Sequence, residues 1–311
     1  MNEESKILVS ICCITYNHAK FVREALEGFL MQEPPTCVPK GTKMSDWCEI
    51  LIHDDASTDG TDAIVCEYAE KYPELIRPLY ETENQYSRGG AGRMAVLFNY
   101  KRAKGKYIAY CEGDDYWTDT KKLQKQVDWM ESHEEYSVCW HRCKQLIIET
   151  GEIKDDDCYK VLQGKDGVEI DLATYFSDWF TQPLTMLFRR SMYDLNWHKQ
   201  FTYYRDEHEL YQLLKRGKGY LFGFYAGMYV RHNGGMFTSM SKSAQYETSL
   251  NVSRELWQVN RDEFTKSFYA DVLQRLIYIY SRSLLQKWTL SWELYRLDGN
   301  AKQFIKNIIR R

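Results

Sequence analysis

The sequence lacks any apolar run long enough to cross a membrane, and it lacks an excess of charge of one sign. A membrane-spanning helix needs about 20 consecutive apolar residues, and no stretch of the 311 residues approaches that length. The 41 basic and 44 acidic residues give a formal net charge of −3, which leaves no general field to attract nucleic acid. We therefore expect no transmembrane helix and no nucleic-acid partner.

Features of secreted proteins are also missing. The first residues lack the basic segment and the long apolar segment of a signal peptide, which predicts a cytoplasmic protein. The nine cysteines are an odd number scattered along predicted strands and helices, a pattern that favours reduced thiols over a disulfide framework. The closest cluster, Cys139, His141 and Cys143, lacks the second pair of ligands that a structural zinc site needs.

Short β-branched runs alternate with helical patterns over the first 120 residues, the order typical of βαβ units around a mostly parallel sheet. From about residue 246 the periodicity is helical. This order predicts an α/β domain followed by a helical extension. The predicted strands are 7–14, 49–53, 75–80 and 106–110, and the predicted helices are 18–31, a segment from 59 or 61 to 72, and 121–132.

Three carboxylates, those of Glu112, Asp114 and Asp115, follow the fourth predicted strand within four residues. Carboxylates this close repel one another, and a hard divalent cation shared with substrate phosphates is the usual relief. The alternative is an acidic turn that caps the next helix. The motif indicates a site for Mn²⁺ or Mg²⁺.

Two further polar loops follow the first and second predicted strands. One is Thr15-Tyr16-Asn17, and the other runs from Asp54 to Thr61 and contains both acids and hydroxyls. Taken singly, each could be only a turn or a helix cap. Because open α/β sheets bind ligands beyond the carboxyl ends of their strands, three polar loops at three strand ends predict one binding site.

The ordered set of these motifs resembles the family 2 glycosyltransferases over about residues 7 to 240. The set comprises Val9-Ser-Ile11, Thr15-Tyr-Asn17, Asp54-Asp55-x-Ser57-x-Asp59-Gly60-Thr61, and Gly105-Lys-Tyr-Ile108 leading into Glu112-x-Asp114-Asp115. The resemblance implies the GT-A fold, a Rossmann-like nucleotide-binding α/β domain with a mostly parallel central sheet. It implies a GT-A domain over 1–240, with a nucleotide-sugar-binding half over 1–120 and an acceptor-binding half over 121–240, and a C-terminal helical extension over 241–311.

The resemblance also implies an activity. It is the metal-dependent, inverting transfer of a sugar from a nucleotide sugar, with a UDP-sugar expected, to a hydroxyl of a saccharide or lipid-linked saccharide. Polysaccharide and lipopolysaccharide synthesis are the implied settings. The donor-binding residues that it implies are Thr15, Tyr16, Asn17, Asp55, Arg88, Arg93, Glu112, Asp114 and Asp115.

Individual roles follow from the same resemblance. Tyr16 is expected to contact the base, and Asp55 to accept a base N–H, which favours uracil. Asp114 matches the family's metal ligand. His232, in the loop Arg231-His-Asn-Gly-Gly235, is expected to contact the metal or the diphosphate, and the alternative is a histidine in a simple turn. Glu112 stands where the family usually has the first Asp of its DxD motif, so its contact with ribose or metal stays open.

The expected general base is Asp206, at the start of a predicted helix that ends before Gly217-Lys218. Glu207 is the alternative if the alignment slips by one residue, and a simple helix-capping role is the other interpretation of Asp206. Arg88 and Arg93 lie in a Gly-rich segment, either as cations for the diphosphate or as surface arginines.

Two other classes of protein fit part of the pattern. A nucleotidyltransferase usually has a basic, Gly-rich phosphate loop after the first strand, where this chain has Thr-Tyr-Asn-His-Ala-Lys. The other class is a non-catalytic scaffold that binds a nucleotide or a sugar. It is compatible with Glu112 in place of the first Asp of the family's DxD motif.

The segment 271–311 has eight Lys or Arg against three acids. It is expected to lie on the inner face of a membrane, with Trp288, Trp292 and Tyr295 at the headgroups, or to pack on the catalytic domain or on a second subunit of a homodimer.

Overall fold

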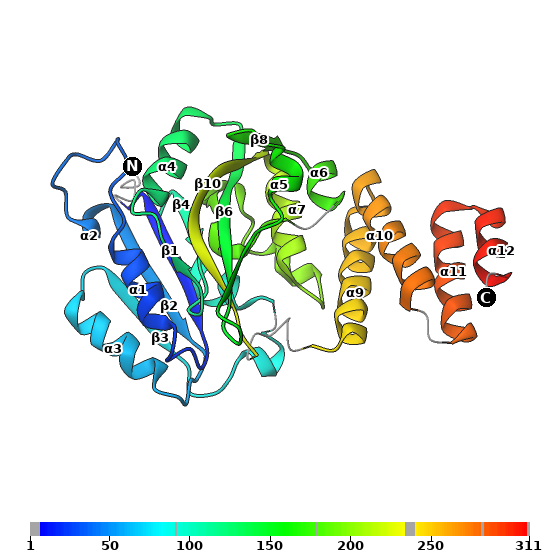
Figure 1. Ribbon diagram of the computed structural model, residues 1–311, viewed down its shortest axis with the longest axis horizontal. Coiled ribbons are helices and arrows are strands. Elements are labelled where there is room, and N and C mark those ends of the chain that lie inside the picture. Colours follow the sequence, from blue (N-terminus) through cyan, green and yellow to red (C-terminus); the bar gives the residue numbers. More distant parts are fainter. Residues whose placement is uncertain (1–6, 91, 178–179, 234–239, 281–282, 310–311) are drawn as a thin grey trace. The chain divides into compact units, whose positions relative to one another are not determined.

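The computed structural model describes residues 7–90, 92–177, 180–233, 240–280 and 283–309 (Figure 1). Contacts divide the chain into two compact units. The first comprises Met1–His198 and Glu209–His232, and the second comprises Lys199–His208 and Asn233–Arg311. The second unit thus includes a short segment around Asp206 as well as the C-terminal part of the chain, and the domain boundary at residue 240 stays a prediction.

One curled sheet forms the centre of the first unit, with the strand order β3-β2-β1-β4-β9-β6-β10-β5. The neighbours β3, β2, β1 and β4 are parallel, as are β6 and β10, while β5, β7, β8 and β9 pair antiparallel to their neighbours. The predicted α/β class is confirmed, and the four predicted strands correspond to the neighbouring parallel strands β1, β2, β3 and β4. The strands are β1 (Val9–Thr15), β2 (Cys48–Asp54), β3 (Ile76–Tyr80), β4 (Tyr107–Tyr110), β5 (Tyr116–Trp117), β6 (Tyr136–Ile147), β7 (Glu152–Asp155), β8 (Gly167–Ile170), β9 (Leu187–Arg189) and β10 (Lys218–Arg231).

One face of the parallel strands is covered by the predicted helices α1 (Val22–Leu30), α3 (Thr61–Lys71) and α4 (Lys122–Ser132), whose apolar residues join the same core as alternate residues of β1, β2 and β4 (Figure 1). Burial of β1 on both of its faces explains its nearly continuous apolar sequence. The polar exception, Ser10, donates to a Glu49 carboxylate oxygen at 2.7 Å and accepts the Gly105 amide at 2.8 Å.

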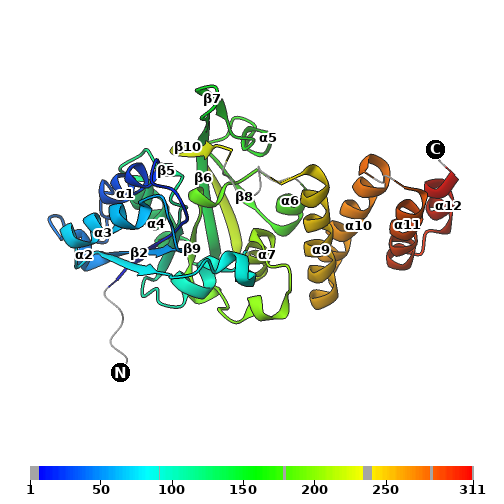
Figure 2. The ribbon, with the colours of Figure 1, turned by 90° about the horizontal axis from the view of Figure 1, so that it is seen from below.

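The opposite face is covered by a helical segment that the sequence prediction does not contain, η2 (Ala95–Tyr100). Figure 2 shows this part of the chain on the other side of the sheet from α1 and α3. Its buried Asn99 donates a side-chain N–H to the Cys13 carbonyl at 2.8 Å. Only six residues long, η2 offers too few turns for its apolar period to be recognised in the sequence.

Further short helices, among the residues that the structure describes, connect these strands. They are α2 (Met44–Trp47), η1 (Tyr86–Gly90), α5 (Tyr159–Leu162), α6 (Leu172–Ser177), η3 (Pro183–Thr185), η4 (Arg190–Met192) and η5 (Trp197–Gln200). A longer helix, α7 (Asp206–Arg216), begins in the second unit and continues into the first.

The predicted C-terminal helical extension is confirmed. It consists of α9 (Lys242–Asn260), α10 (Glu263–Arg275), η6 (Leu276–Tyr280), α11 (Leu284–Asp298) and α12 (Ala301–Ile309). Apolar residues of α10, η6 and α11 form a separate core. Across it, Arg254 binds both carboxylate oxygens of Glu293, at 2.8 and 3.0 Å. Among the described helices, none is both long enough and apolar enough to cross a membrane.

Candidate functional site

The three polar loops of the sequence prediction meet at one edge of the sheet. In the parallel registers, Thr15 of β1 lies opposite Asp54 of β2, and Cys12 lies opposite Tyr110 of β4. Beyond the strands, the Gly113 amide donates to the Ile14 carbonyl at 2.9 Å. The end of β1 therefore lies between the other two polar loops.

Side chains of the loop after β2 bind the backbone of the loop after β1. Ser57 Oγ accepts the Asn17 amide at 2.9 Å, and Asn17 Oδ1 accepts the Thr58 amide at 2.8 Å. Asn17 and Ala56 both have positive φ, at 55° and 62°. For Ala56 this left-handed conformation costs about 1 to 2 kcal/mol. The hydrogen bonds between the loops offset that cost.

Side chains of the loop after β2 also bind the next two amides of the loop after β1, those of His18 and Ala19. Thr61 Oγ1 accepts the His18 amide at 2.8 Å, and Asp59 Oδ2 accepts the Ala19 amide at 3.0 Å. Asp59 Oδ1 in turn accepts the Thr61 amide at 3.1 Å. The motif from Ser57 to Thr61 thus positions the backbone of residues 17–19 and with it the His18 side chain.

Asp55, the predicted base-binding carboxylate, is buried and organises a third loop. Its two carboxylate oxygens accept the amides of Gln85 and Tyr86, at 2.6 and 3.0 Å, and its own amide donates to the Thr15 carbonyl. The Tyr16 ring, by contrast, is 44% exposed. The Tyr16 side chain is therefore partly exposed to solvent, whereas Asp55 holds the backbone of residues 85 and 86.

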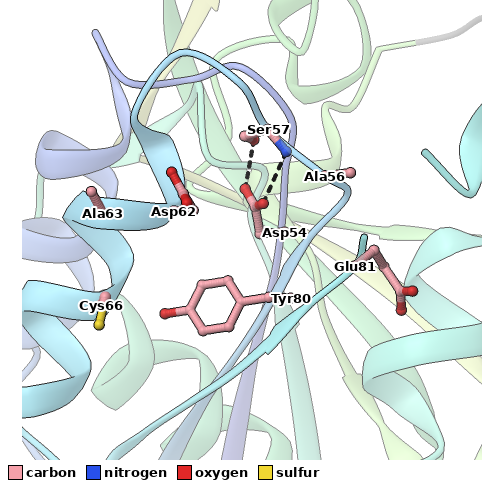
Figure 3. Close-up of a pocket in the computed structure, with 8 residues that line it drawn as sticks. All are labelled: Asp54, Ala56, Ser57, Asp62, Ala63, Cys66, Tyr80 and Glu81. Atoms are coloured by element: carbon pink, nitrogen blue, oxygen red, sulfur yellow. Dashed lines mark hydrogen bonds between the residues drawn. The ribbon is translucent and has the colours of Figure 1, made fainter. Parts of the chain in front are cut away.

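A pocket of about 360 Å³ opens between the ends of β2 and β3 and the first turn of α3 (Figure 3). Within it, Ser57 donates its amide and its hydroxyl to the Asp54 carboxylate, at 3.0 and 2.6 Å. The predicted donor-binding residues lie outside its lining. The lining residues are Asp54, Ala56, Ser57, Asp62, Ala63, Cys66, Tyr80 and Glu81.

The acidic loop after β4 passes close to β1, and this approach requires glycine. A Cβ on Gly113 would lie 2.8 Å from Thr15 Oγ1 and 3.2 Å from His18 Nδ1. On either side of Gly113, the carboxylates have different surroundings. Glu112 Oε1 accepts the Tyr110 hydroxyl at 3.1 Å.

Asp115 is buried, and its Oδ1 accepts the Val230 amide of β10 at 2.8 Å. Burial, with the charges of Asp114 and Glu112, raises its pKa well above the ordinary value. Asp115 thus joins the acidic loop to β10, and the structure gives this predicted donor-binding residue an anchoring contact.

Asp114 lies between two histidines. Its Oδ2 is 3.0 Å from His232 Nε2 and 3.7 Å from His18 Nε2. Burial alone would raise the pKa of Asp114, but the hydrogen bond with His232 and the attraction of His18 hold that pKa below its ordinary value. The bond to Asp114 raises the pKa of His232, and burial lowers that of His18. His232 follows β10, and Gly234 and Gly235 of its predicted loop lie outside the described residues.

These residues fit a divalent cation. Thr15 Oγ1, His18 Nδ1 and Asp114 Oδ1 are buried and have no hydrogen-bond partner in the part of the chain that the structure describes. Buried polar atoms without partners are rare in folded proteins. Ligand atoms of His18, Asp114 and His232 lie within 4.8 Å of one another, as do those of Glu112, Asp114 and Asp115. The sequence prediction contains Asp114 and His232 but not His18.

The predicted cations Arg88 and Arg93 lie on and just after η1. Arg88 is exposed and pairs with Glu83, while Arg93 Nη1 donates to the Gly89 carbonyl at 3.2 Å.

Asp206, the predicted base, is the first residue of α7 and belongs to the second unit. Its side chain reaches solvent, yet the protein atoms packed around it raise its pKa. Burial and the neighbouring Asp206 raise the pKa of Glu207 to about 7.

The fold and this site define a GT-A-type α/β domain with a cluster of carboxylates and histidines, able to hold a divalent cation, at the ends of its parallel strands. Residues 10–197 match the family model described as Glycosyl transferase family 2, which is more than half of the chain. The chain belongs to glycosyltransferase family 2, as its motifs predict.

Curated relatives resemble only part of the chain. An uncharacterized protein of Mycobacterium tuberculosis is 37% identical over 186 residues, which is 58% of this chain and 47% of the relative. The Escherichia coli protein named UDP-Glc:alpha-D-GlcNAc-diphosphoundecaprenol beta-1,3-glucosyltransferase WfaP is 33% identical over 125 residues, 40% of this chain and 42% of that protein. The chain thus matches about half the length, or less, of these relatives.

Two solved structures share the fold at low sequence identity. S. aureus TarS 1-349 in complex with UDP-GlcNAc has a TM-score of 0.66 at 16% identity, covering 97% of this chain and 89% of that chain. The mannosyltransferase PcManGT from Pyrobaculum calidifontis, in complex with GDP-Man and Mn²⁺, has a TM-score of 0.51 at 15% identity, covering 97% and 86%. These similarities support the GT-A architecture.

The role of Asp55 can be tested by Asp55→Asn. The amide keeps one acceptor oxygen but turns an NH₂ group toward the backbone N–H of Gln85 or Tyr86. Leaving a partly buried N–H unsatisfied should lower the free energy of unfolding by about 1 to 3 kcal/mol, measured by urea denaturation. Asp157→Asn is the control, because it removes only an exposed pair with Lys160, worth about 0 to 1 kcal/mol. Equal effects of the two changes would contradict the anchoring role.

Proposed function

We propose that this protein is a metal-dependent, inverting glycosyltransferase that uses a UDP-sugar and transfers the sugar to a hydroxyl of a saccharide or lipid-linked saccharide. The observation that carries the proposal is the cluster of Asp114, His18 and His232 at the strand edge where the family's motifs converge. The names of WfaP and of the TarS complex, with their UDP-Glc and UDP-GlcNAc, support the choice of donor.

The donor's nucleoside would lie against the loops after β1 and β2. The half-exposed Tyr16 ring offers an apolar face to the base. A carboxylate has about four acceptor positions, so the two backbone bonds of Asp55 leave capacity for a base N–H. Arg88 and Arg93 would approach the diphosphate. To bind a phosphate, Arg88 would have to leave its ion pair with Glu83.

Asp114 and His232 would hold the cation, and Mn²⁺ suits an imidazole ligand better than Mg²⁺ does. When bound, the cation supplies a positive charge that stabilises the departing nucleoside diphosphate. Within the same loop, Asp115 keeps its bond to Val230, so the loop stays attached to β10.

Asp206 would accept the proton of the attacking hydroxyl, giving a single displacement with inversion at the anomeric carbon. A general base works best when its pKa is near the working pH. The raised pKa of Asp206 is a shift in that direction. Glu207, with its pKa near 7, is the alternative base.

The donor site is tested by calorimetric titration of UDP with Mn²⁺ present and with EDTA, on the wild type and on Asp114→Ala. We expect binding that requires Mn²⁺ and weakens at least about tenfold in the variant, since a carboxylate ligand of the cation is lost. Absence of binding to UDP, GDP and dTDP alike would contradict the donor site and favour a scaffold.

The base is tested by Asp206→Asn with Glu207→Gln as its matched control. Loss of a general base should lower the transfer rate by about 10²- to 10⁴-fold while UDP affinity is unchanged. Transfer is measured as UDP release from a panel of UDP-sugars with a polyprenyl-diphosphate-linked GlcNAc acceptor. Because the base must be ionised, wild-type kcat/KM should fall as pH drops through the raised pKa of Asp206. Full activity of Asp206→Asn, with loss in Glu207→Gln, would move the role to Glu207.

The C-terminal unit presents an apolar surface on α11. Leu284 and Leu285 are 79% and 75% exposed, and the rings of Trp288 and Trp292 stack 6.1 Å apart. Lys287 lines the same hollow as both leucines and Trp288. A helix with leucine and tryptophan beside a basic side chain is typical of one that lies in a membrane interface. We propose that this surface contacts the membrane that carries a lipid-linked acceptor.

Co-sedimentation of the full chain with phosphatidylglycerol vesicles tests the membrane contact. We expect Leu284→Ser combined with Trp288→Ser to reduce the bound fraction severalfold, since about 1.5 to 3 kcal/mol of apolar burial is lost for each side chain. Phe264→Ser, on α10 and 40% exposed, is the control and should bind like the wild type. If the wild type does not sediment but is a dimer by light scattering, and the double variant is a monomer, the surface belongs to a second subunit.

A further inference from the structure

We propose that His18 is a third protein ligand of the cation, so that two imidazoles and one carboxylate hold it. This inference rests on the proposed function for the presence of a cation at Asp114. It adds a residue that lies in the loop after β1, far in sequence from both the acidic loop and His232. The site would then have a different preference among metals from one built of carboxylates alone.

The distances agree with ligands of one ion. His232 Nε2 and His18 Nε2 lie 3.0 and 3.7 Å from the same oxygen, Asp114 Oδ2. Two atoms that each bind a metal at about 2.0 to 2.2 Å lie about 3 to 3.5 Å apart. A separation of 3.7 Å is too long for a hydrogen bond, so the His18 ring faces Asp114 without bonding to it.

The position of His18 is imposed by neighbours on three elements. Its amide donates to Thr61 Oγ1 at 2.8 Å, and the next amide, of Ala19, donates to Asp59. Gly113 leaves room for the ring, because a Cβ there would lie 3.2 Å from Nδ1. The side chain is only 16% exposed. A buried imidazole held in this way is already oriented for a ligand at Asp114.

The other carboxylates of the acidic loop have partners elsewhere. Glu112 and Asp115 lie within 4.8 Å of Asp114, but Glu112 accepts the Tyr110 hydroxyl and Asp115 accepts the Val230 amide. Asp114 Oδ1, in contrast, is buried with no partner among the described residues. The second imidazole therefore supplies the ligand that a second carboxylate supplies in an all-acidic site. Imidazole favours transition metals over Mg²⁺.

The test is binding of Mn²⁺ alone, followed by the free-ion EPR signal, to the wild type, His18→Gln, His232→Gln and His133→Gln. His133 stacks on Trp129, away from the cluster, and is the matched control. We expect the Mn²⁺ Kd to rise about 10- to 100-fold for His18→Gln and His232→Gln and to stay unchanged for His133→Gln. The wild type should prefer Mn²⁺ over Mg²⁺ more strongly than His18→Gln does.

Pulsed EPR of the wild-type Mn²⁺ complex counts ¹⁴N-coupled imidazoles and needs no variant. Two imidazoles would support the proposal. One imidazole, or a His18→Gln variant with wild-type Mn²⁺ affinity, would overturn it. Failure of the proposed function is seen separately, as absence of Mn²⁺-dependent UDP binding in a wild type whose Mn²⁺ site is intact.

Discussion

The hydrogen bonds between the loops after β1 and β2 are the constraint on which the site depends. Each loop lacks regular structure, and Asn17 and Ala56 both occupy the left-handed region. The side chains of the second loop bind successive amides of the first, at Asn17, His18 and Ala19. Tyr16 and His18 are therefore oriented before any ligand arrives, which reduces the entropy that binding must otherwise overcome.

A second constraint joins the acidic loop after β4 to β10. Asp115 links the acidic loop to Val230, and two residues later His232 reaches Asp114. β5 follows the acidic loop in the chain and pairs with β10, and this pairing brings β10 beside the loop. The two neighbouring aspartates of this loop therefore differ in their surroundings. Burial raises the pKa of Asp115, whereas His232 and His18 outweigh the effect of burial on Asp114 and keep its pKa low.

Much of the fold could be predicted from local pattern. The parallel strands were recognisable from β-branched runs and the helices α1, α3 and α4 from their apolar spacing, because both depend on residues near in sequence. The segment η2 could not be recognised in this way, because six residues are too few to show a helical period. Family membership was predictable as well, because the order of four short motifs is itself a property of the sequence.

The sequence alone determined the class of fold, the family and the edge of the sheet where the polar loops lie. Tertiary structure decided what each polar residue contacts. Asp55 binds backbone amides and Asp115 binds Val230, and nothing in the local sequence distinguishes these two aspartates from Asp114. His18 joins Asp114 across 96 positions of the chain because parallel strands bring their carboxyl ends together. Side-chain partners so distant in sequence leave no local pattern, and only packing selects them.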